Sequence, residues 1–208
     1  MKLFLSSQAI SQAQAPHLVK LVGKPAEDIK LALIENAADV EDGPKDWLTR
    51  NRANIMSHGF DVERLDLQDY MGDADDLWDR LASKDVIWCG GGNTFYLNWL
   101  LHETGADVII QGLVKDGIVY GGGSAGAIVA GPTLKHFEIA DDPSKAPELL
   151  LDGLAVTQTV VVPHADNEKY GPLMHDITEK LQSDGYATVL LKDAQALVVN
   201  GREWKVVE

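Results

Sequence analysis

Short apolar runs alternate with longer amphipathic stretches along most of this chain, and this alternation constrains the fold more than any other feature of the sequence. The expected strands are Lys2–Leu5, Ile29–Ile34, Asp61–Asp66, Val86–Cys89, Ile118–Tyr120, Val160–Val162 and Thr188–Leu191. The expected helices lie around Ala15–Val22, Lys45–His58, Ala74–Ala82, Thr94–Leu101, Ala106–Lys115 and Leu173–Gln182. Strands that alternate with helices in this way form βαβ units, whose strands pair in parallel. The pattern therefore predicts an α/β fold with a mostly parallel sheet.

The end of the chain has a different pattern. Ala194–Val199 and Trp204–Val207 are strand-like, and Asn200-Gly201 lies between them. This dipeptide favours a two-residue turn with positive φ, so a C-terminal β-hairpin is predicted. No linker rich in Pro, Gly or Ser divides the sequence and no internal repeat is visible. We therefore expect residues 1–208 to form one three-layer α/β domain.

The charge and composition exclude several classes of protein. The 208 residues include 18 Lys and Arg against 32 Asp and Glu, a net charge of −14, whereas a nucleic-acid partner would favour clustered basic residues. No apolar run approaches the roughly 20 residues of a membrane helix, and no targeting segment is visible. The single cysteine, Cys89, excludes an internal disulfide and fits a reducing compartment. We expect a cytoplasmic protein with no nucleic-acid partner and no membrane association.

The segment from Ile118 to Gly131 (IVYGGGSAGAIVAG) carries the most chemical information. An apolar strand runs into glycines and then into a helix of small residues. Gly122-x-Ser124-x-Gly126 matches the nucleophile elbow, in which a serine occupies a strained turn between strand and helix. The helix N-terminus would favour a developing oxyanion, and Ala125 would donate its backbone N–H to it. Ser124 is therefore a candidate nucleophile.

The same segment permits two other interpretations. Gly121-x-Gly123-x-x-Gly126, with Asp141 20 residues after the first glycine, also fits the dinucleotide-binding fingerprint. That fingerprint places its acidic residue at the end of a strand, and Pro132–Pro147 shows no clean strand that would hold Asp141. The other alternative is a glycine-rich turn with a structural serine.

A second strand also ends in three glycines, at residues 90–92. In open parallel sheets such turns line the crevice where ligands bind. One N–H group, from Gly91 or Gly92, would complete an oxyanion hole with Ala125. Taken alone, the turn equally fits a phosphate-binding loop.

A serine nucleophile needs a base, and His164 is the best placed of the six histidines. It follows Val160–Pro163, so it comes just after the carboxyl end of a buried strand, where we expect it on the same sheet edge as Ser124. A histidine there can take the hydroxyl proton and return it to the leaving group. His136 and His175 are weaker candidates, and a structural loop histidine is the alternative.

The acid that would orient the histidine is not selected by the sequence. A carboxylate must fix the imidazole tautomer and stabilise the imidazolium. Five acidic residues lie between Ser124 and His164, namely Glu138, Asp141, Asp142, Glu148 and Asp152. Asp141 and Asp142 precede Pro143 in an expected loop, so either can point inward.

Three motifs together resemble the peptidase E family, the serine peptidases that include aspartyl dipeptidases and cyanophycinases. These motifs are Gly90-Gly91-Gly92-Asn93-Thr94-Phe95, Gly123-Ser124-Ala125-Gly126-Ala127 and Pro163-His164. The resemblance extends from the first strand to about Asp193. It implies an α/β/α sandwich related to class I glutamine amidotransferases, with serine in place of their cysteine nucleophile.

The resemblance also implies roles for individual residues. Ser124 would be the nucleophile and His164 the base, with the oxyanion hole formed by the N–H groups of Gly92 and Ala125. The acid would be Asp142, or else Asp141 or Glu138. No cofactor and no metal are implied. The expected partner is a small peptide substrate, and a homodimer is compatible with this interpretation.

One feature departs from the aspartyl dipeptidases, in which an arginine after the catalytic histidine is expected to hold the acidic side chain of the substrate. Residues 165–201 contain no arginine and only three lysines, Lys169, Lys180 and Lys192. We therefore expect a small peptide, dipeptide or related amide as the substrate rather than strictly Asp-X peptides.

Three other functions remain as alternatives. In α/β-hydrolase esterases the histidine normally follows the serine by far more than the 40 residues found here. A nucleotide- or metabolite-binding protein and an inactive amidotransferase-like scaffold are the non-catalytic alternatives.

Overall fold

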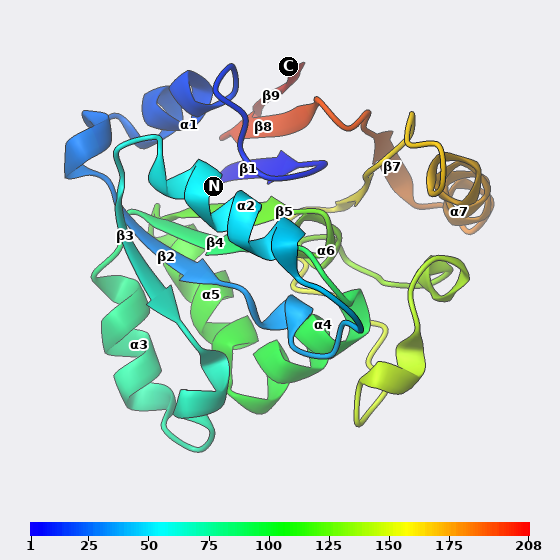
Figure 1. Cartoon of the computed structure of the whole chain (residues 1–208), viewed down its shortest axis with the longest axis horizontal. Coiled ribbons are helices and arrows are strands. Elements are labelled where there is room, and N and C mark those ends of the chain that lie inside the picture. Colours follow the sequence, from blue (N-terminus) through cyan, green and yellow to red (C-terminus); the bar gives the residue numbers. More distant parts are fainter.

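The computed structural model describes residues 1–208 and contains the predicted alternation of strands and helices (Figure 1). The strands are β1 (Lys2–Ser6), β2 (Lys30–Ile34), β3 (Asp61–Leu65), β4 (Val86–Cys89), β5 (Val119–Gly123), β6 (Thr159–Val162), β7 (Ala187–Leu190), β8 (Ala196–Asn200) and β9 (Glu203–Val207). The α-helices are α1 (Ala15–Val22), α2 (Asp46–Met56), α3 (Ala74–Ala82), α4 (Thr94–Glu103), α5 (Ala106–Lys115), α6 (Ala125–Ile128) and α7 (Gly171–Ser183). Short 3₁₀ turns occupy Ala26–Asp28, Asn36–Ala38, Leu67–Tyr70, Phe137–Ile139 and Pro143–Lys145. None of the helices combines the length and the apolar character needed to cross a membrane.

Seven strands form the main sheet in the order β3-β2-β4-β5-β1-β8-β9. The first five are parallel, β8 is antiparallel to β1, and β9 is antiparallel to β8. Asn200 still pairs with Glu203, so the hairpin turn is Gly201-Arg202, one residue later than predicted. Gly201 has φ +65°, a conformation that glycine adopts at little cost. The predictions of a mostly parallel sheet and a C-terminal hairpin are confirmed.

β6 and β7 form a separate two-stranded parallel sheet, with α7 as the crossover between them (Figure 1). The expectation that the strands before Ser124 and His164 share one sheet edge is therefore wrong. The edge of β1 that lies away from β5 is occupied by β8, so β6 cannot pair with β1 there. Val160, Val161 and Val162 are nevertheless fully buried in the apolar core that also covers β5. The small sheet is thus joined to the main one by packing.

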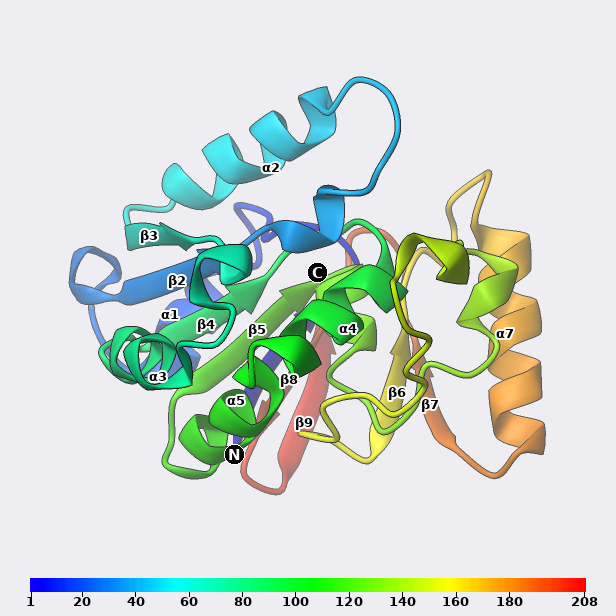
Figure 2. The ribbon, with the colours of Figure 1, turned by 90° about the horizontal axis from the view of Figure 1, so that it is seen from below.

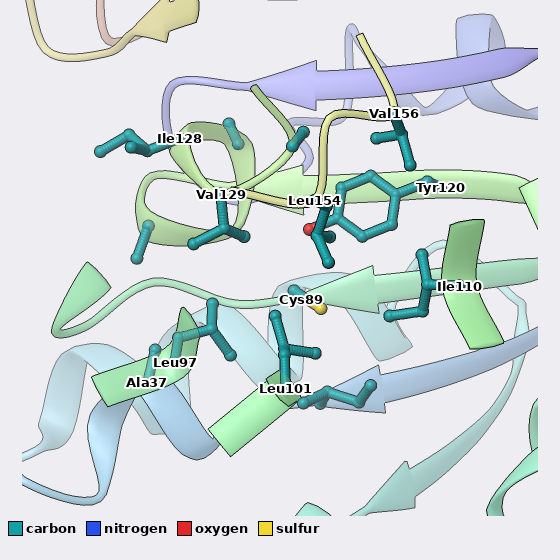
Figure 3. Packing of buried hydrophobic residues seen from close by; sticks show 14 of the residues in the cluster. Ala37, Cys89, Leu97, Leu101, Ile110, Tyr120, Ile128, Val129, Leu154 and Val156 are labelled. Carbon is teal, nitrogen blue, oxygen red and sulfur yellow. The ribbon is translucent and has the colours of Figure 1, made fainter. Parts of the chain in front are cut away.

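Helices cover both faces of the main sheet, which gives three layers (Figure 2). The first face is covered by α1 and α2, over a cluster of 16 buried apolar residues. The other face is covered by α3, α4 and α5, over a cluster of 42 that continues into the small sheet. Figure 3 shows part of this larger core, in which Cys89 and Tyr120 lie among Leu97, Leu101 and Ile110. The small sheet is therefore anchored in the larger core.

β5 extends further than predicted: it continues past Tyr120 through three glycines and ends at Gly123. The neighbouring ring of Trp88 explains these glycines. A Cβ on Gly121 would lie 2.4 Å from Trp88 Cε3, a distance that no side chain tolerates. A Cβ on Gly123 would lie 2.5 Å from the carbonyl oxygen of Gln8. The glycines therefore let Trp88 and the chain after β1 pack directly on the backbone of β5.

Candidate active site

Ser124 occupies the sharp turn between β5 and α6. Its backbone has φ +52° and ψ −112°, and such sparsely populated conformations cost about 1–3 kcal/mol. A Cβ on Gly122 would lie 2.2 Å from the carbonyl oxygen of Gly126, and a Cβ on Gly126 would lie 2.0 Å from that of Cys89. Only glycines therefore allow α6 to pack this closely on β5 and β4, with Ser124 at the carboxyl end of β5.

His164 follows β6 and contacts Ser124, as the sequence predicts. The distance between Ser124 Oγ and His164 Nε2 is 3.0 Å, which is a hydrogen bond. The backbone of His164 has φ +64° and donates its N–H to Ser7 Oγ at 2.8 Å. On one side of the imidazole lies the ring of Tyr170, with ring centroids 5.9 Å apart. The backbone of His164 is thus held by Ser7, and its ring is held by Ser124 and by packing against Tyr170.

The carboxylate that contacts His164 is Asp193, which follows β7. His164 Nδ1 lies 2.6 Å from Asp193 Oδ1, so the N–H on this nitrogen donates to the carboxylate. The other oxygen, Oδ2, accepts a hydrogen bond from Asn167 Nδ2 at 3.1 Å. The backbone N–H of Asp193 donates to Asp166 Oδ1 at 2.7 Å. Ser124, His164 and Asp193 therefore form one continuous hydrogen-bonded chain.

The pKa of Asp193 is lowered from its ordinary value of 3.8. Partial burial is the largest influence and would raise this pKa, since it disfavours the charged form. Hydrogen bonds from His164, Asn167 and Gln8, together with the charge of His164 when it is protonated, outweigh burial and lower the pKa. The carboxylate is consequently ionised at neutral pH.

None of the three acids expected from the sequence contacts His164. Asp141 Oδ2 accepts a hydrogen bond from the backbone N–H of Thr94 at 2.7 Å, at the start of α4. Asp142 Oδ1 accepts bonds from the backbone N–H and the hydroxyl of Ser144, at 2.9 and 2.7 Å. Glu138 lies exposed in the turn Phe137–Ile139. The structure thus differs from the expectation of an acid between Ser124 and His164.

The physical reason is the crossover β6-α7-β7. Because β6 and β7 are parallel neighbours, with Val162 opposite Leu190, the residues that follow them come together at one end of the small sheet. Ala165 donates its backbone N–H to the carbonyl of Leu191 at 2.9 Å, which fixes the two strand ends side by side. The predicted strand at Thr188–Leu191, with Asp193 two residues after its end, is the signal in the sequence that points to this acid.

The two glycine-rich turns meet at Ser124. A Cβ on Gly91 would lie 3.2 Å from Ser124 Cβ and 3.7 Å from Ser124 Oγ, so the loop after β4 passes beside the hydroxyl. Gly92 has φ +138°, and a Cβ there would lie 2.2 Å from the carbonyl oxygen of Ala37. The N–H groups of Gly92 and Ala125 are not used by the backbone hydrogen bonds of the chain. Since α6 has only four residues, these individual N–H groups matter more than a helix dipole.

A cavity of about 520 Å³ opens beside the serine and the histidine. Gly91, Gly92, Ser124 and His164 line it, together with apolar side chains such as Phe137, Tyr170 and Met174. A further wall is formed by α2, which contributes Trp47, Leu48, Arg50, Asn51, Arg52 and Ile55. The sequence analysis did not predict this wall, because nothing in a helix pattern says which cavity the helix borders.

Neither glycine-rich turn needs a phosphate group to explain its glycines. The Cβ direction of Gly121 is filled by Trp88, and that of Gly92 is filled by the backbone at Ala37. These glycines therefore serve close packing within the protein, whereas a dinucleotide fingerprint needs glycine for close approach of the pyrophosphate. Asp141, the acidic residue of that fingerprint, is bonded to Thr94. No group of three or more His, Cys, Asp or Glu side chains is arranged to hold a metal ion.

Comparisons with known proteins point to one family of peptidases. Residues 3–207 match the model of peptidase family S51. An uncharacterized peptidase of Pasteurella multocida is 29% identical, in an alignment that covers 99% of this chain and 96% of the relative. Peptidase E of Escherichia coli O6 is 28% identical over 134 residues, which cover 64% of this chain and 56% of the relative.

Solved structures share the fold. The crystal structure of a Listeria monocytogenes protein with a provisional peptidase E name superposes with a TM-score of 0.85 and 25% identity, over 99% of this chain and 97% of that one. A peptidase from an acI-B1 actinobacterium, at 19% identity, superposes with a TM-score of 0.68 over 99% of this chain and 86% of that one, and so supports the fold alone.

Proposed function

Because this chain belongs to peptidase family S51 and is thus a serine peptidase, we propose that it cleaves short peptides with Ser124 as nucleophile, His164 as base and Asp193 as the orienting acid. The observation that carries this assignment is the hydrogen-bonded chain from Ser124 Oγ to His164 Nε2, at 3.0 Å, and from His164 Nδ1 to Asp193, at 2.6 Å. Geometry of this kind, rather than order in the sequence, identifies a catalytic triad.

The first half of the reaction forms an acyl-enzyme. His164 Nε2 takes the proton of Ser124 as the hydroxyl oxygen attacks the carbonyl carbon of the scissile bond. Asp193 keeps the Nδ1–H tautomer in place and stabilises the imidazolium that forms. The imidazolium then donates its proton to the leaving amine, and the C–N bond breaks. In the second half, His164 takes a proton from a water molecule that attacks the acyl carbon. The ester bond to Ser124 then breaks, the proton returns to Ser124 Oγ, and the carboxylic acid product is released.

The oxyanion of each tetrahedral intermediate needs hydrogen-bond donors. The N–H groups of Gly92 and Ala125 border the serine and are free of other backbone bonds. Preorganised donors of this kind contribute roughly 3–4 kcal/mol each to transition-state stabilisation in related chemistry. The close packing of Gly92 against Ala37 and of Ala125 behind Ser124 supports their preorganisation.

The cavity supports a small substrate. Its volume of about 520 Å³ suits a ligand of a few amino-acid residues rather than a folded protein. Both apolar and polar side chains line its wall, as a peptide with both kinds of group requires. The match to a peptidase family favours this interpretation over the metabolite- or nucleotide-binding alternative.

A fluorophosphonate probe and a panel of short peptides test the proposal. We expect the probe to label the protein at Ser124 and Ser124→Ala to remain unlabelled. Peptide hydrolysis by Ser124→Ala should fall by roughly 10⁴- to 10⁶-fold in kcat, as for triad residues in general. Ser83→Ala is the matched control, because Ser83 is an exposed serine at the end of α3. Wild-type labelling at another residue, or full activity of folded Ser124→Ala, would contradict the assignment.

A further inference from the structure

Five charged side chains besides His164 line the catalytic cavity, namely Glu35, Glu41, Arg50, Arg52 and Asp141. Two of them neutralise each other. Arg52 lies 2.8 Å from Glu35, and a second arginine, Arg64, lies 3.0 Å from the same carboxylate. The guanidinium of Arg52 is therefore engaged within the protein and is not available to a ligand.

Arg50 is in a different position. It lines the cavity from α2, its side chain is exposed, and it takes part in none of the ion pairs of the chain. The segment that follows His164 contributes no arginine as far as Gly201. Arg50 is consequently the one cation in the cavity, apart from the catalytic histidine, that a carboxylate of the protein does not already hold.

The two remaining charged side chains of the cavity are acidic and contrast with the unpaired Arg50. Glu41 and Asp141 also line the cavity and form no ion pair, and Asp141 accepts a hydrogen bond from Thr94. Burial is the main cause that raises the pKa of Glu41, and the charge of Asp141 raises it further, whereas Lys145 and Lys45 lower it. Among the charged side chains that line the cavity, Arg50 is thus the unpaired one whose charge attracts an anionic group on a substrate.

We propose that Arg50 binds a carboxylate of the peptide substrate, an inference that rests on the proposed peptidase function. A guanidinium presents N–H donors in a planar fork that matches the two oxygens of a carboxylate. A short peptide carries such a group at its C-terminus, and an Asp or Glu residue carries one in its side chain. Arg50 thus favours short peptides that carry a negative charge. The other side chains of the cavity that form no ion pair, Glu41 and Asp141, are acidic.

The test compares matched peptides on Arg50→Ala, Arg50→Lys and the wild type. One pair of peptides differs only in a free or amidated C-terminus, and another pair has Asp or Asn at one position. We expect Arg50→Ala to lower kcat/KM by about 10- to 100-fold for the carboxylate-bearing member of one pair, chiefly through KM, and to leave the uncharged members unchanged. Arg50→Lys should lie between, because an ammonium keeps the charge without the fork. The affected pair identifies which carboxylate is bound.

A binding measurement separates this inference from the proposed reaction. Titration of the same peptides into Ser124→Ala and into Ser124→Ala with Arg50→Ala needs no turnover. We expect the preference for the carboxylate peptide to disappear only in the second variant. Arg202→Ala is the control, since Arg202 is an exposed arginine in the turn between β8 and β9. Equal losses for charged and uncharged peptides, or no change of preference, would overturn the role of Arg50, whatever the fate of the hydrolytic mechanism.

Discussion

At the scale of single residues, hydrogen bonds fix the position of Asp193, the acid that we propose orients His164. Both carboxylate oxygens accept hydrogen bonds, one from His164 and one from Asn167, and its own N–H donates to Asp166. The same bonds lower the pKa of Asp193 although burial opposes them. The carboxylate is therefore ionised at neutral pH and accepts the Nδ1–H of the imidazole, which fixes the tautomer of His164.

Asp193→Asn tests the identity of the acid. The amide keeps the shape of the side chain but presents the wrong hydrogen-bonding group to the imidazole, so we expect kcat to fall by roughly 10⁴-fold. Asp142→Asn is the matched control, because the side chain of Asp142 is exposed and accepts hydrogen bonds only from Ser144 within its own turn. Steady-state kinetics on both variants, with folding checked by circular dichroism, decides between them. A larger loss in Asp142→Asn than in Asp193→Asn would contradict the assignment.

At the scale of elements, the turn from β5 into α6 depends on contacts that leave no space for a side chain. The Cβ position of Gly126 lies 2.0 Å from the carbonyl oxygen of Cys89, and that of Gly122 lies 2.2 Å from the carbonyl oxygen of Gly126. Both obstacles are backbone atoms, which cannot rotate away as a side chain can. The position of Ser124 is therefore set by how closely α6 approaches β4.

Gly126→Ala tests this dependence. The added methyl group must push α6 away from β4, so we expect a loss of about 3 kcal/mol or more in the free energy of unfolding, or no folded protein at all. Gly90→Ala is the control, because a Cβ there would lie 3.5 Å from the nearest atom, the carbonyl oxygen of Ile34, which is an ordinary contact. Urea denaturation of both variants measures the difference. Equal stability of the two variants would show that the turn tolerates a wider packing.

The sequence could predict what depends on local pattern. The strands, the helices and the hairpin follow from apolar periodicity and from turn residues, and Ser124 and His164 follow from their places at strand ends. The sequence could not predict the features that depend on how strands and helices pack against one another. The small sheet forms because β8 occupies the edge of β1, and Asp193 reaches His164 because two parallel strands end together. The cavity wall at Arg50 likewise depends on where α2 packs.

At the scale of the whole molecule, the larger core encloses Cys89 completely. The thiol belongs to the last residue of β4 and lies among the apolar side chains shown in Figure 3. Burial raises the pKa of Cys89 to about 12, although a hydrogen bond with Tyr120 opposes this rise. The thiolate, which is the reactive form, is therefore scarce in the folded protein at neutral pH.

Thiol alkylation consequently reports on the folding of the entire chain. We expect iodoacetamide at pH 8 to leave the folded protein unlabelled and fully active, and to label one residue, Cys89, once urea unfolds the chain. The labelling rate across a urea series, measured by mass spectrometry, should follow the unfolding transition seen by circular dichroism. Rapid labelling of the folded protein would show that this core opens locally.

The three groups that we propose as catalytic do not all come from the same sheet. Ser124 ends a strand of the seven-stranded sheet, whereas His164 and Asp193 follow the two strands of the small one. Ser7, at the end of β1, accepts a hydrogen bond from the backbone of His164 and so ties the two sheets together beside the reacting atoms. A misplacement of about 1 Å between reacting groups can lower a rate a hundredfold. A small shift of one sheet against the other would therefore abolish activity while every strand stayed intact. Catalytic competence in this chain is thus a more fragile property than its fold.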